Sequence, residues 1–340
     1  MTKRKLTRRQ QWRIDKIQDE RTARVAKRDK VTDEQMNESD LGPEQLGLII
    51  THYGTQVVVE ATEGELAGQH QRCHFRSNLG SLVTGDRVVW RTGNPMGVVV
   101  AVMPRDSALQ RPDPHGDMKT VAANIDRIMI VVAPYPEPHA NLIDRYLVAC
   151  ADANIPALLV LNKTDLLKDN DPILALIAEY QALGYEVMQT QADGDLTALT
   201  QRLKNETVAF VGQSGVGKST LINAIVPDAA QKTNVISENS ALGQHTTTST
   251  RLIGFGEGAS LIDSPGIREF GLWHLDADKV QRGFPEIENL LGYCQFRNCT
   301  HKHEKQCALR LAAANGEILT RRLDSYLRLI DEIAEAQQKN

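Results

Sequence analysis

One octapeptide has the residue types and spacing needed to hold a phosphate group. The segment from Gly212 to Ser219 reads GQSGVGKS and fits the pattern G-x-x-x-x-G-K-[ST], between an apolar run, Val208–Val211, and a helical stretch, Thr220–Ile225. In such a loop, backbone N–H groups surround the phosphate at the positive end of the following helix. We expect Lys218 to bridge the β- and γ-phosphates and Ser219 to coordinate Mg²⁺. The predicted phosphate-binding residues are Gly212, Gln213, Ser214, Gly215, Val216, Gly217, Lys218, Ser219 and Thr220.

A tetrapeptide that could read a purine base follows another apolar run. Asn162-Lys163-Thr164-Asp165 comes directly after Ala157–Leu161 and fits N-K-x-D. In this pattern the Asp carboxylate accepts hydrogen bonds from guanine N1–H and the exocyclic amine, which adenine cannot offer. The Asn side chain contacts N7 and O6, and the Lys stem packs over the base. The tetrapeptide therefore predicts a GTPase that recognises guanine through Asn162, Lys163, Thr164 and Asp165. It disfavours a phosphate-loop kinase, which would not need guanine selectivity.

A third segment could sense the terminal phosphate. Asp263-Ser264-Pro265-Gly266 ends the apolar stretch Ser260–Ile262 and lies 44 residues beyond Ser219. We expect Asp263 to support Mg²⁺ and the Gly266 N–H to meet the γ-phosphate. In a Ras-like GTPase the phosphate loop comes first and N-K-x-D fourth, whereas here N-K-T-D precedes both other motifs. The order predicts a circularly permuted G domain.

Four sulfur and nitrogen ligands lie close together near the C-terminus. Cys294, Cys299, His301 and Cys307 fall within fourteen positions, a complete tetrahedral set for one structural Zn²⁺. His303 is an alternative to His301. A disulfide is the poorer interpretation for a protein of a reducing compartment. Cys73 and Cys150 lie in apolar runs and are expected in the core.

The elements that must position these motifs divide the 340-residue chain into four parts. Residues 1–45 form a basic arm and linker, and 46–111 form a small all-β barrel of the OB type. Residues 112–275 form an α/β G domain with buried strands at Ile125–Ala133 and Ala157–Leu161, and 276–340 form a mainly helical zinc-binding domain. The Pro-rich passage at Arg111–Pro114 marks the predicted boundary after the barrel.

Charge is distributed unevenly along the chain. The first thirty residues hold twelve basic and four acidic side chains, a balance of +8, whereas the remainder carries −12. A basic arm favours a polyanionic partner, with a solvated tail as the alternative. No apolar run approaches the ~18 residues of a membrane helix, and the charged N-terminus lacks a secretory signal, so we expect a cytoplasmic protein without a membrane partner.

In this combination and order, the barrel, the permuted G motifs and C-x₄-C-x-H-x₅-C resemble the ribosome small-subunit-dependent GTPase A family. The resemblance covers about 46–335 and extends to Gly243–Thr248 (GQHTTT), which looks like the switch I segment of that family. It implies weak GTP hydrolysis, stimulated by the small ribosomal subunit, late in 30S assembly. The Ser-Ala of the fifth guanine motif is reduced to Thr190-Gln191-Ala192.

The attacking water needs a positioning group, and Ile267 occupies the place of the Ras-like Gln. Within the switch I candidate, His245 is the proposed catalytic residue beside Lys218, with a simple loop histidine as the alternative. Thr247 or Thr248 should complete the Mg²⁺ site; we name Thr247.

The expected partners are GTP or GDP, the 30S subunit and 16S rRNA, and we expect a monomer. The rival function is a nucleic-acid chaperone that senses GTP and GDP without useful turnover.

Overall fold

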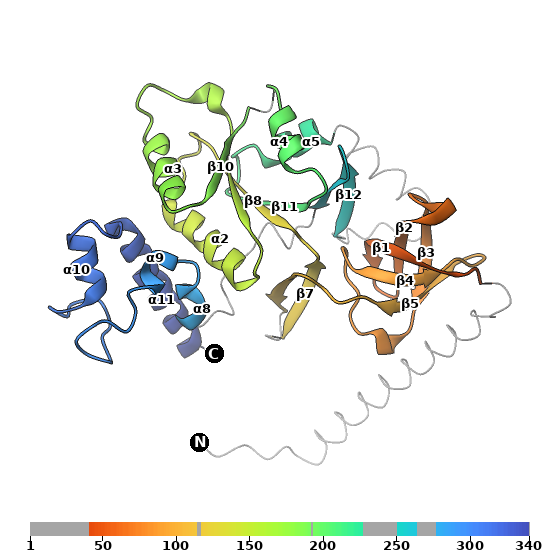
Figure 1. The fold of residues 1–340 in the computed structure, drawn as a ribbon, viewed down its shortest axis with the longest axis horizontal. Coiled ribbons are helices and arrows are strands. Elements are labelled where there is room, and N and C mark those ends of the chain that lie inside the picture. The colour runs from red at the N-terminus through yellow and green to blue at the C-terminus, as the bar shows by residue number, and fades with distance from the viewer. Residues whose placement is uncertain (1–40, 114–116, 192, 227–249, 264–276, 340) are drawn as a thin grey trace, which may run out of the picture. The chain divides into compact units, whose positions relative to one another are not determined.

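A computed structural model describes residues 41–113, 117–191, 193–226, 250–263 and 277–339 (Figure 1). His245, Thr247 and Gly266 lie outside these residues, as does the basic arm. The chain forms two compact units, of which the first ends at Pro104 and the second begins at Arg105. Within the described ranges, no helix combines the length and apolar character that a membrane crossing requires.

The first unit is the predicted all-β barrel, and it has five strands. Its strands are β1 (Glu44–Tyr53), β2 (Gln56–Ala61), β3 (His70–Phe75), β4 (Arg87–Arg91) and β5 (Gly97–Val102), with short 3₁₀ turns at Gly64–Leu66 and Ser77–Leu79. The strands pair in the order β1-β2-β3-β5-β4, and β4 returns to β1, which closes the ring. All pairs are antiparallel except β3 with β5.

Alternating side chains fill the barrel. Val57, Val59, Val88 and Trp90 are buried with Cys73 in one cluster, as period-2 patterning requires. A Cβ at Gly47 would lie 2.5 Å from the Trp90 indole nitrogen, so this close approach requires glycine.

The second unit is built on a six-stranded sheet in the order β10-β9-β8-β11-β13-β12. The strands are β8 (Arg127–Val132), β9 (Ala157–Leu161), β10 (Glu186–Gln189), β11 (Thr207–Val211), β12 (Arg251–Phe255) and β13 (Ala259–Asp263). All neighbours are parallel except β12 with β13. The helices between them are α2 (Ala140–Asp152), α3 (Pro172–Ala182), α4 (Thr197–Arg202) and α5 (Lys218–Ile225), and a 3₁₀ turn spans Thr164–Leu166.

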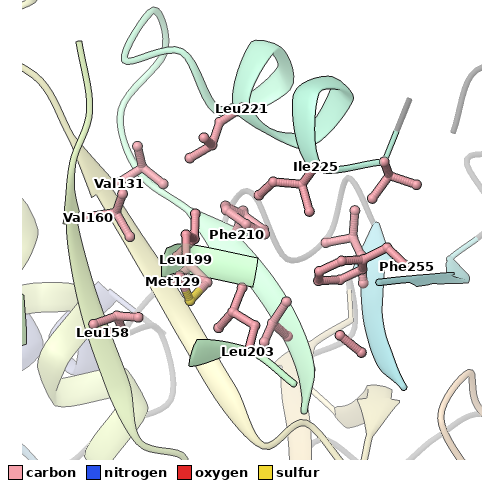
Figure 2. Packing of buried hydrophobic residues seen from close by; sticks show 14 of the residues in the cluster. Met129, Val131, Leu158, Val160, Leu199, Leu203, Phe210, Leu221, Ile225 and Phe255 are labelled. Atoms are coloured by element: carbon pink, nitrogen blue, oxygen red, sulfur yellow. The ribbon is translucent and has the colours of Figure 1, made fainter. Parts of the chain in front are cut away.

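One face of this sheet carries the main core. Figure 2 shows Leu221 and Ile225 of α5 and Leu199 of α4 pointing toward strand residues such as Phe210. The cluster takes alternate positions of each strand: Met129 and Val131, Leu158 and Val160, Val208 and Phe210. The intervening residues face the other side of the sheet and are also buried, which explains why these strands read as continuous apolar runs.

Several short elements were not predicted from the sequence. They are the antiparallel hairpin β6 (Ala108–Pro112) and β7 (Met118–Ala123), together with β10, α4 and β12. Arg111 and Pro112, expected at a domain boundary, lie in β6. The Pro112 N has no hydrogen to donate, and the residue occupies the end of a strand that has one partner.

The C-terminal lobe, residues 277–339, is helical. It contains α8 (Ala277–Gln281), α9 (Pro285–Glu288), α10 (Ala308–Ala314) and α11 (Thr320–Lys339). Its apolar core includes Val148 and Ala149 of α2, and a Cβ at Gly283 would lie 2.5 Å from Val148 Cα. The lobe therefore shares its core with a helix of the G domain.

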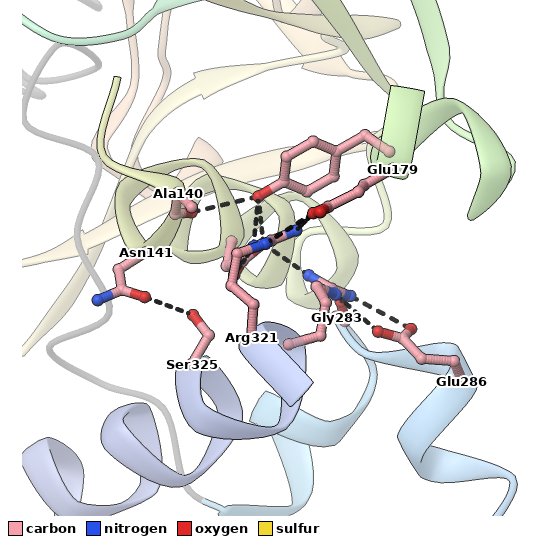
Figure 3. Close-up of polar contacts among 10 residues, drawn as sticks. Ala140, Asn141, Glu179, Gly283, Glu286, Arg321 and Ser325 are labelled. Carbon is pink, nitrogen blue, oxygen red and sulfur yellow. Dashed lines mark hydrogen bonds and ion pairs between the residues drawn. The ribbon is translucent and has the colours of Figure 1, made fainter. Parts of the chain in front are cut away.

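A buried charge cluster joins the same parts (Figure 3). Arg322 of α11 and Asp144 of α2 are fully buried and pair at 2.7 Å, and Arg322 also pairs with Glu286 at 2.6 Å. Arg321 bridges Asp144 and Glu179, and the Tyr180 hydroxyl donates to Asp144 at 2.6 Å. These ion pairs bring opposite charges together and offset part of the cost of burying them.

Candidate functional site

The phosphate loop lies between the carboxyl end of β11 and the start of α5. It lines a cavity of about 490 Å³ formed by Lys163, Gly212, Ser214, Gly215, Gly217, Lys218, Ser219 and Thr220. Gly212 has φ 141°, and a Cβ there would lie 2.3 Å from the Val131 carbonyl oxygen. Gly217 has φ 92° and would place a Cβ 2.5 Å from Asn162 Nδ2. Only glycine fits at these two positions, so the backbone itself lines the cavity.

Lys218 is held at the loop. Its Nζ donates to the carbonyl oxygens of Gly212 and Gln213, both at 2.7 Å. The ammonium therefore stands in the phosphate cavity, at the amino end of α5, where helix and side chain both favour an anion.

Asn162 joins the base-reading loop to the phosphate loop. Its side chain is fully buried, Nδ2 donates to the Val216 carbonyl at 3.0 Å, and Oδ1 accepts from the Thr190 hydroxyl at 3.1 Å. The sequence interpretation placed this amide against N7 and O6 of the base. In the structure its bonds to Val216 and Thr190 join the two loops, so Asn162 fixes their shape, and its contact with the base stays a prediction.

Lys163 forms a second link between the same loops. It has left-handed backbone angles, φ 58° and ψ 45°, and its Nζ donates to Gly215 O at 2.6 Å and Tyr135 O at 3.1 Å. Lys163 therefore lines the cavity, and its contact with the base stays a prediction. Asp165 is exposed in the 3₁₀ turn that follows.

Thr190 is a supporting residue whose importance was missed. Besides the bond to Asn162, its carbonyl accepts from the Thr164 N–H and hydroxyl, both at 3.3 Å. The signal was present in Thr190-Gln191-Ala192, interpreted as a degraded fifth motif. Ala192 lies outside the described residues.

The third motif is described only at its first residue. Asp263 ends β13, so the motifs after β9, β11 and β13 all meet the carboxyl edge of one parallel sheet. This is the edge at which open α/β sheets bind ligands.

The four predicted metal ligands converge. The ligand atoms of Cys294, Cys299, His301 and Cys307 all lie within 4.8 Å of one another. The Sγ atoms of Cys294 and Cys307 are 3.9 Å apart, and His301 Nδ1 lies 3.4 Å and 3.3 Å from them. Tetrahedral Zn²⁺ with Zn–S bonds of about 2.3 Å requires sulfur atoms about 3.8 Å apart. The geometry therefore fits a closed four-ligand metal site.

Electrostatics also favour a cation there. Burial, with the thiols of Cys294 and Cys307, raises the pKa of Cys299 to about 12. Burial lowers the pKa of His301, which keeps its imidazole neutral and able to donate a lone pair. Clustered thiols ionise together only when a metal compensates the charge. The Ala308 N–H donates to Cys294 Sγ at 3.4 Å, a bond that would support a thiolate.

Comparison with known proteins identifies the family of this chain. Residues 102–273 match the RsgA GTPase family. The chain is 51% identical over its full length to the small ribosomal subunit biogenesis GTPase RsgA of Marinobacter nauticus, covering 99% of that protein. It is 54% identical over 98% of its length to the protein of that name from Pseudomonas putida, again covering 99% of the relative.

Solved structures agree with the fold. YjeQ from Thermotoga maritima superposes with a TM-score of 0.69 at 28% identity, over 86% of this chain and 99% of the other. YloQ, described as a circularly permuted GTPase, gives 0.68 at 27% identity, over 86% of this chain and 96% of the other. The predicted architecture of barrel, permuted G domain and helical metal-binding lobe is confirmed. The chain belongs to the RsgA GTPase family and is a GTP hydrolase.

Proposed function

We propose that this protein hydrolyses GTP to GDP and phosphate when stimulated by the small ribosomal subunit, late in 30S maturation. The names of its relatives, small ribosomal subunit biogenesis GTPases, support the subunit as partner. The basic arm supports contact with 16S rRNA, since phosphate neutralisation releases counterions. A cytoplasmic monomer is the form that we propose.

The observation that carries the proposal is the physical connection between the base loop and the phosphate loop. Asn162 and Lys163 each bond to the phosphate loop, at Val216 and Gly215. A base recognised by Asp165 and phosphates held by the loop would therefore order one continuous site. This arrangement suits a guanine nucleotide, and both loops of the site come from this one chain.

For the reaction, we assign Lys218 to the β- and γ-phosphates and Asn162, Lys163, Thr164 and Asp165 to guanine. Upon nucleotide binding, the Lys218 ammonium would exchange its two carbonyl partners for phosphate oxygens. Ser219 and Thr247 would hold Mg²⁺, supported by Asp263, and the ion would neutralise charge that develops on the phosphates. Gly266 would donate its N–H to the γ-phosphate.

His245 is the residue that we propose to orient the water. This role follows from the motif resemblance and from Ile267, whose side chain has no polar atom to bind water. Stimulation by the subunit would then consist of fixing His245 in place, because orientation alone supplies large rate factors.

For the metal cluster we propose one structural Zn²⁺. Three cysteines and one histidine fill all four positions of a tetrahedral site, so no position remains for a substrate or water.

Hydrolysis should be measured with GTP alone and with purified 30S, 50S and 70S particles. We expect faster phosphate release with 30S and little change with 50S. Equal rates under every condition would support the rival function, a nucleic-acid chaperone that only senses GTP and GDP.

A further inference from the structure

The metal loop, residues 289–307, exposes two large aromatic side chains. Tyr293 is 79% exposed and Phe296 is 52% exposed. Cys294 and Cys299 belong to the metal cluster and flank residues 295–298, and Tyr293 directly precedes Cys294. A metal ion bound there would fix both ends of residues 295–298, so Phe296 would be displayed at little further entropic cost.

The surroundings of the two aromatic residues are basic. Between 289 and 311 the chain has four basic residues, Arg297, Lys302, Lys305 and Arg310, and one acidic residue, Glu304. Lys302 pairs with Asp331, and Arg310 donates to the Lys302 carbonyl oxygen. Arg297 and Lys305 are exposed. The Gln295 N–H donates to Gln306 O, and this bond joins the segment that carries Arg297 to the segment that carries Lys305. This local charge stands out in a chain that carries −12 beyond its arm.

We propose that the metal loop is a stacking surface for unpaired RNA, in which Tyr293 and Phe296 stack on bases and Arg297 and Lys305 contact phosphates. Exposed aromatic rings among basic side chains suit single strands, whose bases are free to stack. A duplex keeps its bases stacked internally and would use only the charges. The proposal rests on the proposed function, because the RNA in question is an unpaired stretch in the small subunit.

The test uses the full-length, zinc-loaded protein and two fluorescent probes. One is a single-stranded 12-nucleotide RNA of mixed sequence, and the other is the same RNA paired with its complement. Dissociation constants are obtained from anisotropy at several salt concentrations. The double variant Tyr293→Leu/Phe296→Leu removes both rings and retains apolar side chains of similar size. We expect it to bind the single strand about 10-fold or more weakly, and the duplex within 2-fold of wild type.

A matched variant separates stacking from charge. Arg297→Gln/Lys305→Gln should weaken both probes and reduce the salt slope by about 0.7 per lost contact for the single strand. Phe296→Tyr keeps a ring and should bind like wild type. Leu174→Ala, at an exposed leucine on α3, controls for nonspecific loss of apolar surface. Zinc content and GTP affinity, measured on each variant, should stay at wild-type values.

Unchanged single-strand binding by Tyr293→Leu/Phe296→Leu would overturn the proposal. Equal losses with both probes would also overturn it, since stacking must discriminate. If the variant binds RNA normally but associates poorly with 30S particles, the surface contacts protein, and the RNA assignment is wrong. A wild-type protein that binds the probes as expected but is not stimulated by 30S would instead refute the proposed function alone.

Discussion

At the scale of single residues, recognition of the base and of the phosphates depends on the same buried amide. Asn162 Nδ2 bonds to Val216 O and lies against Gly217, so displacing this side chain would disturb both loops. Thr190 in turn fixes the amide from the other side. We infer that substitutions at Asn162 reduce affinity for the whole nucleotide, whereas substitutions at Asp165 change which base is preferred.

Asp165→Asn should shift preference from GTP toward xanthosine triphosphate. The carboxylate can accept from N1–H and the 2-amino group, whereas an amide can donate to the 2-oxo group of xanthine. We expect GTP affinity to fall by about 10- to 100-fold, the value of a charge-assisted hydrogen bond. Titration with fluorescent analogues of both nucleotides measures the change, and unchanged GTP affinity would refute the role of Asp165.

His245→Ala should separate binding from catalysis. A water-orienting group acts mainly in the transition state, so we expect nucleotide affinity within a few-fold of wild type and 30S-stimulated hydrolysis about 100-fold slower. Lys218→Ala is the contrasting variant and should weaken nucleotide binding itself. Normal stimulated turnover by His245→Ala would assign the water to another group.

The residues of the site were predictable where chemistry dictates their type. Gly212, Gly217 and Lys218 follow from a phosphate that must be reached by backbone and ammonium, and the four metal ligands follow from zinc chemistry. The partner of Asn162 was not predictable in the same way. Thr190 is 28 positions away, and a lone threonine carries no sign of the side chain that it will meet.

At the scale of elements, α2 holds the G domain and the C-terminal lobe together. Its residues Val148 and Ala149 lie in the core of the lobe, while Asp144 pairs with Arg321 and Arg322 of α11. Arg322 also stacks on Phe284, 4.1 Å from the ring centroid. A buried pair of this kind contributes little net stability against apolar residues of equal size, but the loss of one partner is costly.

Arg322→Met should destabilise the protein by about 3 kcal/mol, because Asp144 and Glu286 then keep buried charge with fewer partners. Arg145→Met is the matched control, since Arg145 and Glu332 form a partly exposed pair between the same two helices. We expect it to cost under about 1 kcal/mol. Urea unfolding measures the free energy of unfolding of both variants. Equal losses of this free energy would show that burial of the ion pair does not determine the loss.

Element prediction succeeded where patterns are long or strongly apolar. Strands β8 and β9 agree with the predicted ranges, Ile125–Ala133 and Ala157–Leu161, to within two residues at each end. The hairpin β6–β7 and helix α4 were missed for physical reasons. Pro112 argues against a strand, and α4 spans six residues, too few to show helical periodicity.

At the scale of the whole second unit, the metal loop and the nucleotide site are connected through continuous structure. Cys307 is part of the lobe core that also contains Val148 of α2, and the chain before α2 supplies Tyr135 O to Lys163. The helices of the lobe and α2 supply most of this core, so loss of the metal should disturb the loop more than the helices.

Loss of the metal is best tested with two neighbouring histidines. His301→Ala removes a ligand from the cluster, whereas His303→Ala changes an exposed residue that does not belong to it. Because the ion's binding energy is folding energy for the loop, His301→Ala and Cys299→Ser should lose zinc and the order of residues 289–307. GTP affinity should survive, since the phosphate and base loops belong to a separate core. Stimulation by 30S should fall to the basal rate, because the loop carries the proposed RNA surface.

Metal analysis, hydrogen exchange and hydrolysis assays on all three variants give the result. Full stimulation of a zinc-free His301→Ala protein would show that the metal only stabilises the lobe, and zinc loss in His303→Ala would show that the ligand set has been assigned wrongly.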